Sequence, residues 1–355
     1  MVKALERRDL EDPGQTRPWS ETELTRWLDA RGLLATKRVT KISPMSQRAL
    51  ASLIELDDGS ALFIKQPLPH RREGLLLTLL AARDDLRLIR GLLPSLLDYD
   101  AASNVMVIEG LTRHRSMREL CLSRPPEDGP LVRAVARGLS RLHTASKASG
   151  LLAEDACPRH VENPVPTYGR LSPTDLAHAP GVGFPAYLTA AQEINGALRS
   201  LRASWSPECL IHGDFKDDNI MVGLRAAGGG SDQEPELTFI DWELGGWGDP
   251  LWDVGCMVGQ FLYHWVASIR PSQERDFAAW VRNAAIPFAE VRGAASAFVS
   301  CYASEADRAL TGPDECLTKI VQFAGLFLLH RTIATLEAMG TMPGGAFIAC
   351  RWGAR

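Results

Sequence analysis

Two separated stretches constrain the fold of this chain more than any other feature. One is the run Ile-His-Gly-Asp-Phe-Lys-Asp-Asp-Asn at residues 211–219, and the other is Asp241, 22 residues after Asn219. Short β-like segments at 220–222 and 237–240 flank a glycine-rich stretch between them. If these segments pair as antiparallel strands, Asn219 and Asp241 lie together at the open end of one hairpin. The spacing therefore predicts that two oxygen-bearing side chains face one point.

The side chains near this hairpin are those that phosphoryl transfer from ATP requires. The reaction needs oxygen ligands for Mg²⁺ and a carboxylate that orients the attacking hydroxyl, and it needs little covalent chemistry from the protein. We expect Asp214 to accept the hydroxyl proton, and we expect Asn219 and Asp241 to bind the metal ion. Lys216, two residues after Asp214, is expected either to contact the transferring phosphate or to face solvent. The same spacing of His, Asp, Asn and a later Asp is used by kinases.

Length and charge exclude several other classes of protein. The chain has 355 residues, enough for two core-forming units, because domains commonly have about 100–150 residues. Its 39 basic and 43 acidic residues are interspersed, so we expect no basic surface that would bind nucleic acid. Seven scattered cysteines without a Cys-x-x-Cys pair favour reduced thiols. Together with the lack of a signal peptide or membrane span, they predict a cytoplasmic protein.

The hydrophobic pattern predicts a small α+β part followed by a mainly helical part. In the first part, the hydrophobic pattern changes between the period of a helix and the two-residue alternation of a strand. Helices are expected at 19–31 and 71–82, and strands at 51–56, 61–65 and 104–109. Ser20 and Glu23 form a capping-box pattern at the start of the first helix.

Helices dominate the rest of the chain. The clearest are expected at 131–146 and 317–339. A stretch at 155–185 contains six prolines and is longer than ordinary connections, so it is expected to be either a substrate-facing loop or a disordered insert. Asp249 and Pro250 predict a further helix start, with a capping acceptor and a proline at the first helical position.

The ordered set of motifs resembles the aminoglycoside phosphotransferase and choline kinase superfamily, the small-molecule branch of the protein-kinase-like fold. The motifs are His212-Gly213-Asp214 with Asn219, then Ile-Asp-Trp-Glu at 240–243, then Gly-Asp-Pro at 248–250 and Asp253. This resemblance implies an α+β fold with two lobes. The N-lobe, residues 1–108, would carry an antiparallel sheet, and the larger C-lobe, residues 109–355, would be mainly helical.

The resemblance also assigns residues that would bind the nucleotide. Lys65 matches the strand lysine that contacts the α- and β-phosphates, and Glu73 is its expected ion-pair partner. The Glu109 carbonyl and the Leu111 amide match the hinge that meets adenine. The segment 42–47 takes the place of the nucleotide-covering loop but lacks the glycine repeat of protein kinases.

One departure from protein kinases bears on regulation, and two further residues are expected to support the catalytic loop. The chain reaches Asp249 only eight residues after Asp241, so no long activation segment fits, and a constitutively assembled site is expected. Asp253, one turn into the following helix, is expected to hold the backbone of the catalytic loop, and His212 is expected to support that loop rather than to act as a base.

The expected activity is therefore transfer of the γ-phosphoryl group of ATP to a hydroxyl, with Mg²⁺. The acceptor would be a small molecule or natural-product intermediate: an amino sugar, an amino alcohol, or a Ser/Thr of a biosynthetic peptide. A biosynthetic partner protein is a further candidate partner. A second interpretation is a catalytically silent nucleotide-binding scaffold that binds a partner protein. The presence of Lys65, Asp214, Asn219 and Asp241 favours the enzyme.

Overall fold

The chain forms two compact units. The computed structural model describes residues 19–45, 51–67, 73–121, 129–149, 161, 163, 198–224, 234–270, 277–306 and 313–339. One unit consists of Met1–Gly74 and Ser95–Thr112, and the other of Leu75–Pro94 and Arg113–Arg355. The lobe limits expected from the sequence, 1–108 and 109–355, stay a prediction.

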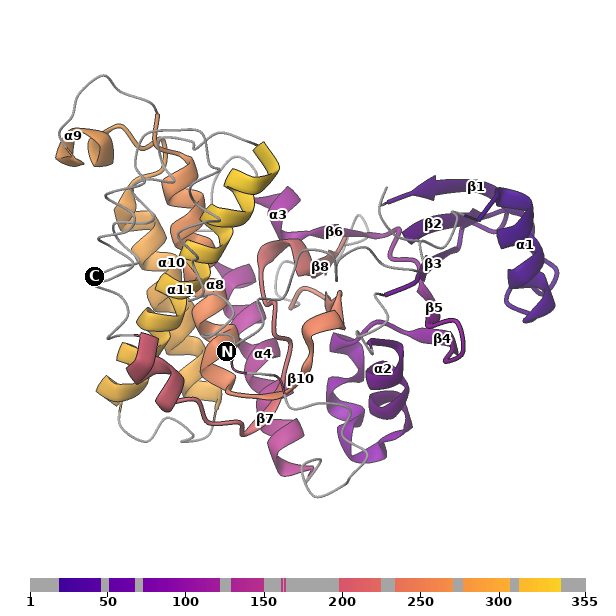
Figure 1. Cartoon of the computed structure of the whole chain (residues 1–355), viewed down its shortest axis with the longest axis horizontal. Coiled ribbons are helices and arrows are strands. Elements are labelled where there is room, and N and C mark those ends of the chain that lie inside the picture. Colours follow the sequence, from indigo (N-terminus) through magenta and orange to yellow (C-terminus); the bar gives the residue numbers. More distant parts are fainter. Residues whose placement is uncertain are drawn as a thin grey trace, which may run out of the picture. The chain divides into compact units, whose positions relative to one another are not determined.

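The first unit is built on a five-stranded antiparallel sheet with the order β1-β2-β3-β5-β4 (Figure 1). Its strands are β1 (Val39–Pro44), β2 (Ala51–Leu56), β3 (Ala61–Lys65), β4 (Leu96–Asp100) and β5 (Val105–Glu109). The predicted hairpin of 51–56 and 61–65 is confirmed, as is the strand expected at 104–109. Strand β4 was not expected from the sequence, because only its last four residues alternate between apolar and polar and two of them are aspartates, which are depleted in strands.

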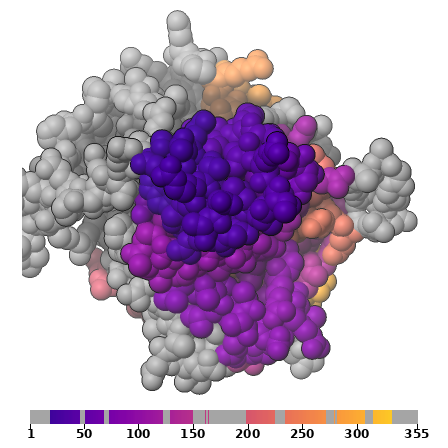
Figure 2. Space-filling view, turned by 90° about the vertical axis from the view of Figure 1, so that its right-hand side faces the viewer, coloured from indigo at the N-terminus to yellow at the C-terminus, as the bar shows by residue number. Residues whose placement is uncertain are grey.

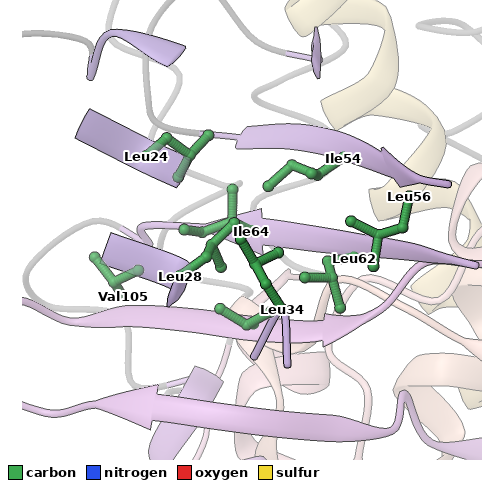
Figure 3. Close-up of a cluster of buried hydrophobic side chains, with 9 residues drawn as sticks. Leu24, Leu28, Leu34, Ile54, Leu56, Leu62, Ile64 and Val105 are labelled. Carbon is green, nitrogen blue, oxygen red and sulfur yellow. The ribbon is translucent and has the colours of Figure 1, made fainter. Parts of the chain in front are cut away.

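Helix α1 (Glu21–Ala30) covers this sheet with one apolar face. The predicted capping box is confirmed: the Ser20 side chain accepts from the Glu23 amide, and the Glu23 carboxylate accepts from the Ser20 amide. Figure 3 shows the core that results, in which buried leucines of α1 lie against strand residues. Its members are Leu24, Leu28, Leu34, Ile54, Leu56, Leu62, Ile64, Val105 and Val107. In the space-filling view, the indigo residues of this part form one contiguous body (Figure 2).

The second unit is mainly helical. Its longer helices are α4 (Pro130–Ala148), α8 (Pro250–Ala267), α10 (Phe288–Glu305) and α11 (Pro313–Met339), and its shorter ones are α3 (Met117–Leu120), α9 (Phe277–Arg282) and a turn of helix at 198–203. Helix α2 (Glu73–Ala82) leads into it, followed by the 3₁₀ helix η2 (Asp84–Leu92). The helices predicted at 71–82, 131–146 and 317–339 are confirmed in the parts that the structure describes.

Two small sheets frame the residues singled out by the sequence. Strands β6 (His114–Ser116), β8 (Ile220–Gly223) and β9 (Leu237–Phe239) form one, in the order β6-β8-β9. Strands β7 (Cys209–Ile211) and β10 (Gly246–Gly248) form the other. The predicted hairpin is confirmed, because β8 and β9 pair antiparallel with Ile220 opposite Phe239. Most of its glycine-rich tip, 225–233, lies outside the described residues.

Helix α8 is the central support of the second unit. It begins as predicted, with the Asp249 side chain accepting from the Leu251 amide and proline at the first position. Helix α11 packs along α8, and the approach is close: a Cβ on Gly255 would lie 2.4 Å from the Cβ of Phe323. Most of α8 is buried, including Trp252 and Asp253. A buried rigid helix of this kind can hold other segments in place.

Some sequence expectations fall outside the part of the chain that the structure describes. The segment 155–185 does so apart from Val161 and Asn163. Within the described residues, no helix has both the length and the apolar character needed to span a bilayer. The cysteines in these residues are free thiols: Cys121, Cys209, Cys256, Cys301 and Cys316.

The packing of α1 can be tested with Leu28→Ala. Leu28 is fully buried, so the cavity should lower the free energy of unfolding by about 2–5 kcal/mol. Leu97→Ala is the control, because Leu97 is 46% exposed in the same unit and should lose about 1 kcal/mol or less. Urea unfolding followed by tryptophan fluorescence measures both. Equal losses in the two variants would show that α1 is not part of this core.

Candidate active site

The loop that follows β7 is held in place by two side chains of α8. The Asp253 carboxylate accepts hydrogen bonds from the amides of His212 and Gly213, at 2.7 and 3.0 Å. The indole of Trp252 donates to the Gly213 carbonyl at 2.8 Å. Both backbone groups of Gly213 are thus fixed by one helix. The support of the loop by Asp253 that the sequence predicted is confirmed.

The ring of His212 connects the two halves of the site. Its Nδ1 accepts from the amide of Asp214 at 3.3 Å, so the ring proton is on Nε2, which donates to the carbonyl of Ile240 at 2.8 Å. Ile240 directly precedes Asp241. His212 is completely buried, and both of its nitrogens bind backbone groups, which is the supporting role expected for it.

Asp214, Lys216 and Asn219 come together on this loop. The Lys216 ammonium forms an ion pair with Oδ2 of Asp214. The Asn219 amide nitrogen donates to the Asp214 carbonyl at 2.9 Å and to its Oδ2 at 3.2 Å. One quarter of the Asp214 side chain is exposed, whereas Asn219 is buried. Asp214 is therefore oriented by two donors and still accessible to a substrate hydroxyl.

Asp241 has a left-handed backbone conformation, with φ 66° and ψ 59°, which is uncommon for a residue other than glycine. It begins the 3₁₀ helix η5 (Trp242–Leu244). The Ile240 amide donates to the Asn219 carbonyl at 2.9 Å, so the hairpin brings Asn219 and Asp241 to its open end. Strained backbone is common at functional sites, where the surrounding structure maintains it.

These donors fit a hard divalent cation. Because the Asn219 nitrogen faces Asp214, its amide oxygen is the atom left for a metal. Mg²⁺ is commonly bound through one or two protein oxygen ligands together with water and substrate phosphates. The residues present therefore suit Mg²⁺ better than a metal that prefers nitrogen or sulfur ligands.

A buried hydrogen-bond chain supports Asp253 from behind. The Nε2 of His143 on α4 lies 3.2 Å from Oδ2 of Asp253, and its Nδ1 lies 2.9 Å from the hydroxyl of Tyr302 on α10. Burial raises the pKa of Tyr302 well above its ordinary value, so the phenol keeps its proton and donates to Nδ1. Three helices thus contribute to the support of the catalytic loop.

Two polar contacts beside the loop were not indicated by the sequence. His264 of α8 lies 2.5 Å from Oδ2 of Asp217, and Arg118 of α3 lies 3.0 Å from Asp218. His264 and Asp217 are 47 residues apart in the sequence, and Arg118 and Asp218 are 100 residues apart. Spacing along the chain therefore carries no signal for them.

The first unit holds the other predicted residues. Lys65 on β3 and Glu73 on α2 form an ion pair, with Nζ and Oε2 2.8 Å apart and Glu73 almost completely buried. Glu109 ends β5, and the amide of Gly110 donates to the Ala61 carbonyl at 2.8 Å, so Leu111 follows directly after the last sheet contact. In the segment 42–47, β1 ends at Pro44, and the last two residues lie outside the described part.

Comparisons with known proteins give a family-model match over most of the chain and a curated relative over a short part of it. A family model described as the phosphotransferase enzyme family matches residues 39–293. Acyl-CoA dehydrogenase family member 11 of Mus musculus is 35% identical over 68 residues. That match covers 19% of this chain and only 8% of the mouse protein.

Solved structures resemble the chain over most of its length. A choline kinase from Streptococcus pneumoniae has a TM-score of 0.53 at 14% identity, covering 93% of this chain and 99% of that one. An ADP-bound aminoglycoside phosphotransferase has a TM-score of 0.56 at 13% identity, covering 94% of this chain and 98% of that one. A glucosamine kinase has a TM-score of 0.53 at 16% identity, covering 95% of this chain and 84% of that one. At these identities the likeness shows the fold, and the expected kinase-like α+β fold is confirmed.

The backbone of the loop can be tested with Gly213→Ala. Gly213 has φ 81°, and an added Cβ would lie 2.3 Å from the Leu244 carbonyl oxygen, so the loop must shift. A shift of about 1 Å at Asp214 should lower kcat by about 10²-fold. The control is Gly293→Ala on α10, where a Cβ meets nothing within 4 Å. Steady-state rates, with melting curves for both variants, measure this effect, and a kcat equal to that of Gly293→Ala would contradict it.

Proposed function

This chain belongs to the phosphotransferase enzyme family, and on that premise we propose that it transfers the γ-phosphoryl group of ATP to a hydroxyl of a small molecule or natural-product intermediate. Its class, a phosphotransferase with an alcohol group as acceptor, follows from the family. The observation that carries the detailed proposal is the arrangement of Asp214, Lys216 and Asn219 on a loop fixed by Asp253.

Asp214 is proposed as the group that accepts the proton of the attacking hydroxyl. A general base must be ionised, oriented and within reach of its substrate. Lys216 and the Asn219 amide orient the carboxylate, and a quarter of the side chain remains exposed. As the hydroxyl oxygen attacks the γ-phosphorus, its proton passes to Asp214 and the bond to the β–γ bridging oxygen breaks, so ADP leaves. Lys216 is proposed to stabilise the charge on the transferring group.

Asn219 and Asp241 are proposed to hold Mg²⁺ against the nucleotide phosphates. When bound, the ion would neutralise charge that develops on the phosphates during transfer. In the chain itself, the His212 bridge and the Ile240 amide keep these two ligands in register before any substrate arrives. The site then loses little free energy to reorganisation on binding.

Lys65, Glu73, Glu109 and Leu111 are proposed to bind the nucleotide. Glu73 holds the Lys65 ammonium in place, as an ion pair does for a phosphate-binding lysine. The Glu109 carbonyl and the Leu111 amide, at the end of β5, would accept from and donate to adenine. Support comes from related folds, since one solved choline kinase structure contains AMP and the aminoglycoside phosphotransferase contains ADP.

The acceptor is proposed to be small, because the related solved folds are named for choline, glucosamine and aminoglycosides. An amino sugar, an amino alcohol and a peptide Ser/Thr hydroxyl were the classes expected from the sequence. Each offers a hydroxyl to the same base, so the geometry around Asp214 alone does not choose among them.

The role of Asp214 can be tested with Asp214→Asn. The amide cannot accept the proton, so turnover should fall by roughly 10²- to 10⁴-fold while nucleotide affinity changes little. Asp84→Asn is the control, because its side chain is 97% exposed and far along the chain from the loop. ADP formation with an acceptor panel and nucleotide titration measure the two quantities. Near-normal turnover in a folded Asp214→Asn protein would exclude Asp214 as the base.

The metal site can be tested with Asp241→Ala. Without this carboxylate, Mg²⁺ should no longer add to the rise in melting temperature that ATP produces, because the extra stabilisation depends on metal binding to the native state. The measurement is the melting temperature with ATP, with and without Mg²⁺. Asp84→Ala should keep the full magnesium increment. If Asp241→Ala also keeps it, Asp241 is not a metal ligand.

A further inference from the structure

The three carboxylates of the catalytic loop are all paired with cationic or imidazole groups of the chain itself. Asp214 pairs with Lys216. Asp217 lies 2.5 Å from Nε2 of His264 on α8. Asp218 lies 3.0 Å from the guanidinium of Arg118 on α3. An incoming ammonium group would therefore have to compete with a partner already in place at each of these carboxylates.

A second arginine, on α11, joins the same group. The guanidinium of Arg331 lies 3.7 Å from Oδ2 of Asp218 and 5.1 Å from the ring centre of Tyr263 on α8. Aromatic faces are the other means by which proteins bind ammonium groups. At Tyr263 that face is already covered by the chain's own cation. Arg118 and Arg331 both lie near Asp218, and the neighbouring Asp217 carboxylate also acts on Arg118.

Arg331 and Asp214 both act electrostatically on one residue of α11, His330. His330 precedes Arg331 on α11, and burial lowers the pKa of His330 to about 4, with opposing effects from the charges of Asp214 and of Lys216 and Arg331. His330 is therefore neutral at pH 7 and lies within the electrostatic reach of both Asp214 and Arg331. Figure 1 shows the yellow end of α11 beside α3, in agreement with the shared contact to Asp218.

We propose that the acceptor carries an anionic group, a carboxylate or a phosphate, and that Arg118 and Arg331 bind this group while the acceptor hydroxyl faces Asp214. The proposal rests on the proposed phosphotransferase function and specifies the substrate class of that site. Guanidinium groups bind carboxylate and phosphate oxygens through two parallel hydrogen bonds, which gives direction as well as charge. Side chains of Arg118 and Arg331 are 45% and 21% exposed, so an anion can reach them.

The proposal separates this chain from the neighbours named for amino-bearing acceptors. An anionic group would share Arg118 with Asp218, and it would replace part of the weaker Asp218 contact of Arg331, whose 3.7 Å separation exceeds hydrogen-bond distance. An ammonium group would instead displace one of the cations or the imidazole that already neighbour the carboxylates. The charge of the acceptor is therefore the property to test.

A matched set of probes varies that charge alone. Glycerate, glycerol 3-phosphate, glycerol and 3-amino-1,2-propanediol share a three-carbon skeleton with a hydroxyl, and they carry a carboxylate, a phosphate, no charge and an ammonium group. ADP release from Mg-ATP measures transfer to each probe, and the melting temperature with each probe measures binding independently of turnover. We expect half-saturation by at least one anionic probe at a concentration about 10-fold or more below that of the neutral and cationic probes.

Variants of the full-length protein then assign the effect to the arginines. Arg331→Met and Arg118→Met should each weaken binding of the preferred anion by about 10-fold, the range for losing a charge-assisted hydrogen bond. Arg331→Lys keeps the charge without the planar fork and should give an intermediate value. The control is Arg292→Met, because Arg292 is an exposed arginine on α10 and its loss should change nothing. A general loss of fold would affect binding of nucleotide as well, which the same melts report.

Each outcome decides the proposal. Glycerate and glycerol 3-phosphate distinguish a carboxylate from a phosphate as the recognised group. Equal or better binding of the ammonium probe, no response to either anion, or an anion preference that survives both methionine variants would overturn the anionic acceptor. The proposed phosphotransferase function fails differently: the wild-type protein would then release no ADP with any acceptor, whatever the melting temperatures show.

Discussion

The hydrogen bonds from the His212 and Gly213 amides to the buried Asp253 carboxylate are the interaction on which the rest of the site depends. A carboxylate without solvent would be costly unless its oxygens accepted hydrogen bonds, and here the two amides and His143 satisfy them. If the loop moved away from α8, the Asp253 carboxylate would lose these hydrogen bonds while still buried among apolar residues. The loop is therefore held against α8. The position of Asp214 is thus a consequence of the cost of burying Asp253, 39 residues later in the chain.

The same support extends to the proposed metal ligands through His212. Its ring bonds the Asp214 amide on one side and the Ile240 carbonyl on the other, so the proposed base and Asp241 share one rigid connection. Trp252 and Trp242 are both buried, and their indoles donate to loop carbonyls at Gly213 and Phe239. The polar groups of the loop are satisfied by a few large side chains that also form the core.

The parts of the site that the sequence predicted are those whose partners lie close in sequence or at a fixed offset. The hairpin of β8 and β9 follows from two β-like runs around a glycine-rich tip, and the start of α8 follows from a capping Asp before proline. The capping box at Ser20 is equally local. Such patterns predict both the type of element and where it begins, because the residues recognised in the sequence themselves make the hydrogen bonds that define the element.

The parts that the sequence did not predict depend on partners far along the chain. Arg118, Arg331 and His264 look like ordinary polar helix residues until the fold brings them to Asp218 and Asp217. The strands β6, β7 and β10 have three residues each, too few for an alternation pattern, and they exist because a neighbour completes their hydrogen bonds. Long-range pairing of this kind is decided by tertiary packing.

Helix α8 has two roles, at two different positions along its axis. Its first turns hold the catalytic loop through Trp252 and Asp253, whereas Tyr263 and His264, about ten residues further and roughly 15 Å along the axis, lie beside the arginines. If the arginines bind the acceptor as proposed, mutations in the later turns would alter which molecule is accepted without disturbing the residues that hold the loop of Asp214. A lineage of such enzymes could diversify its substrates gradually, one exposed turn at a time, while the chemistry is inherited unchanged.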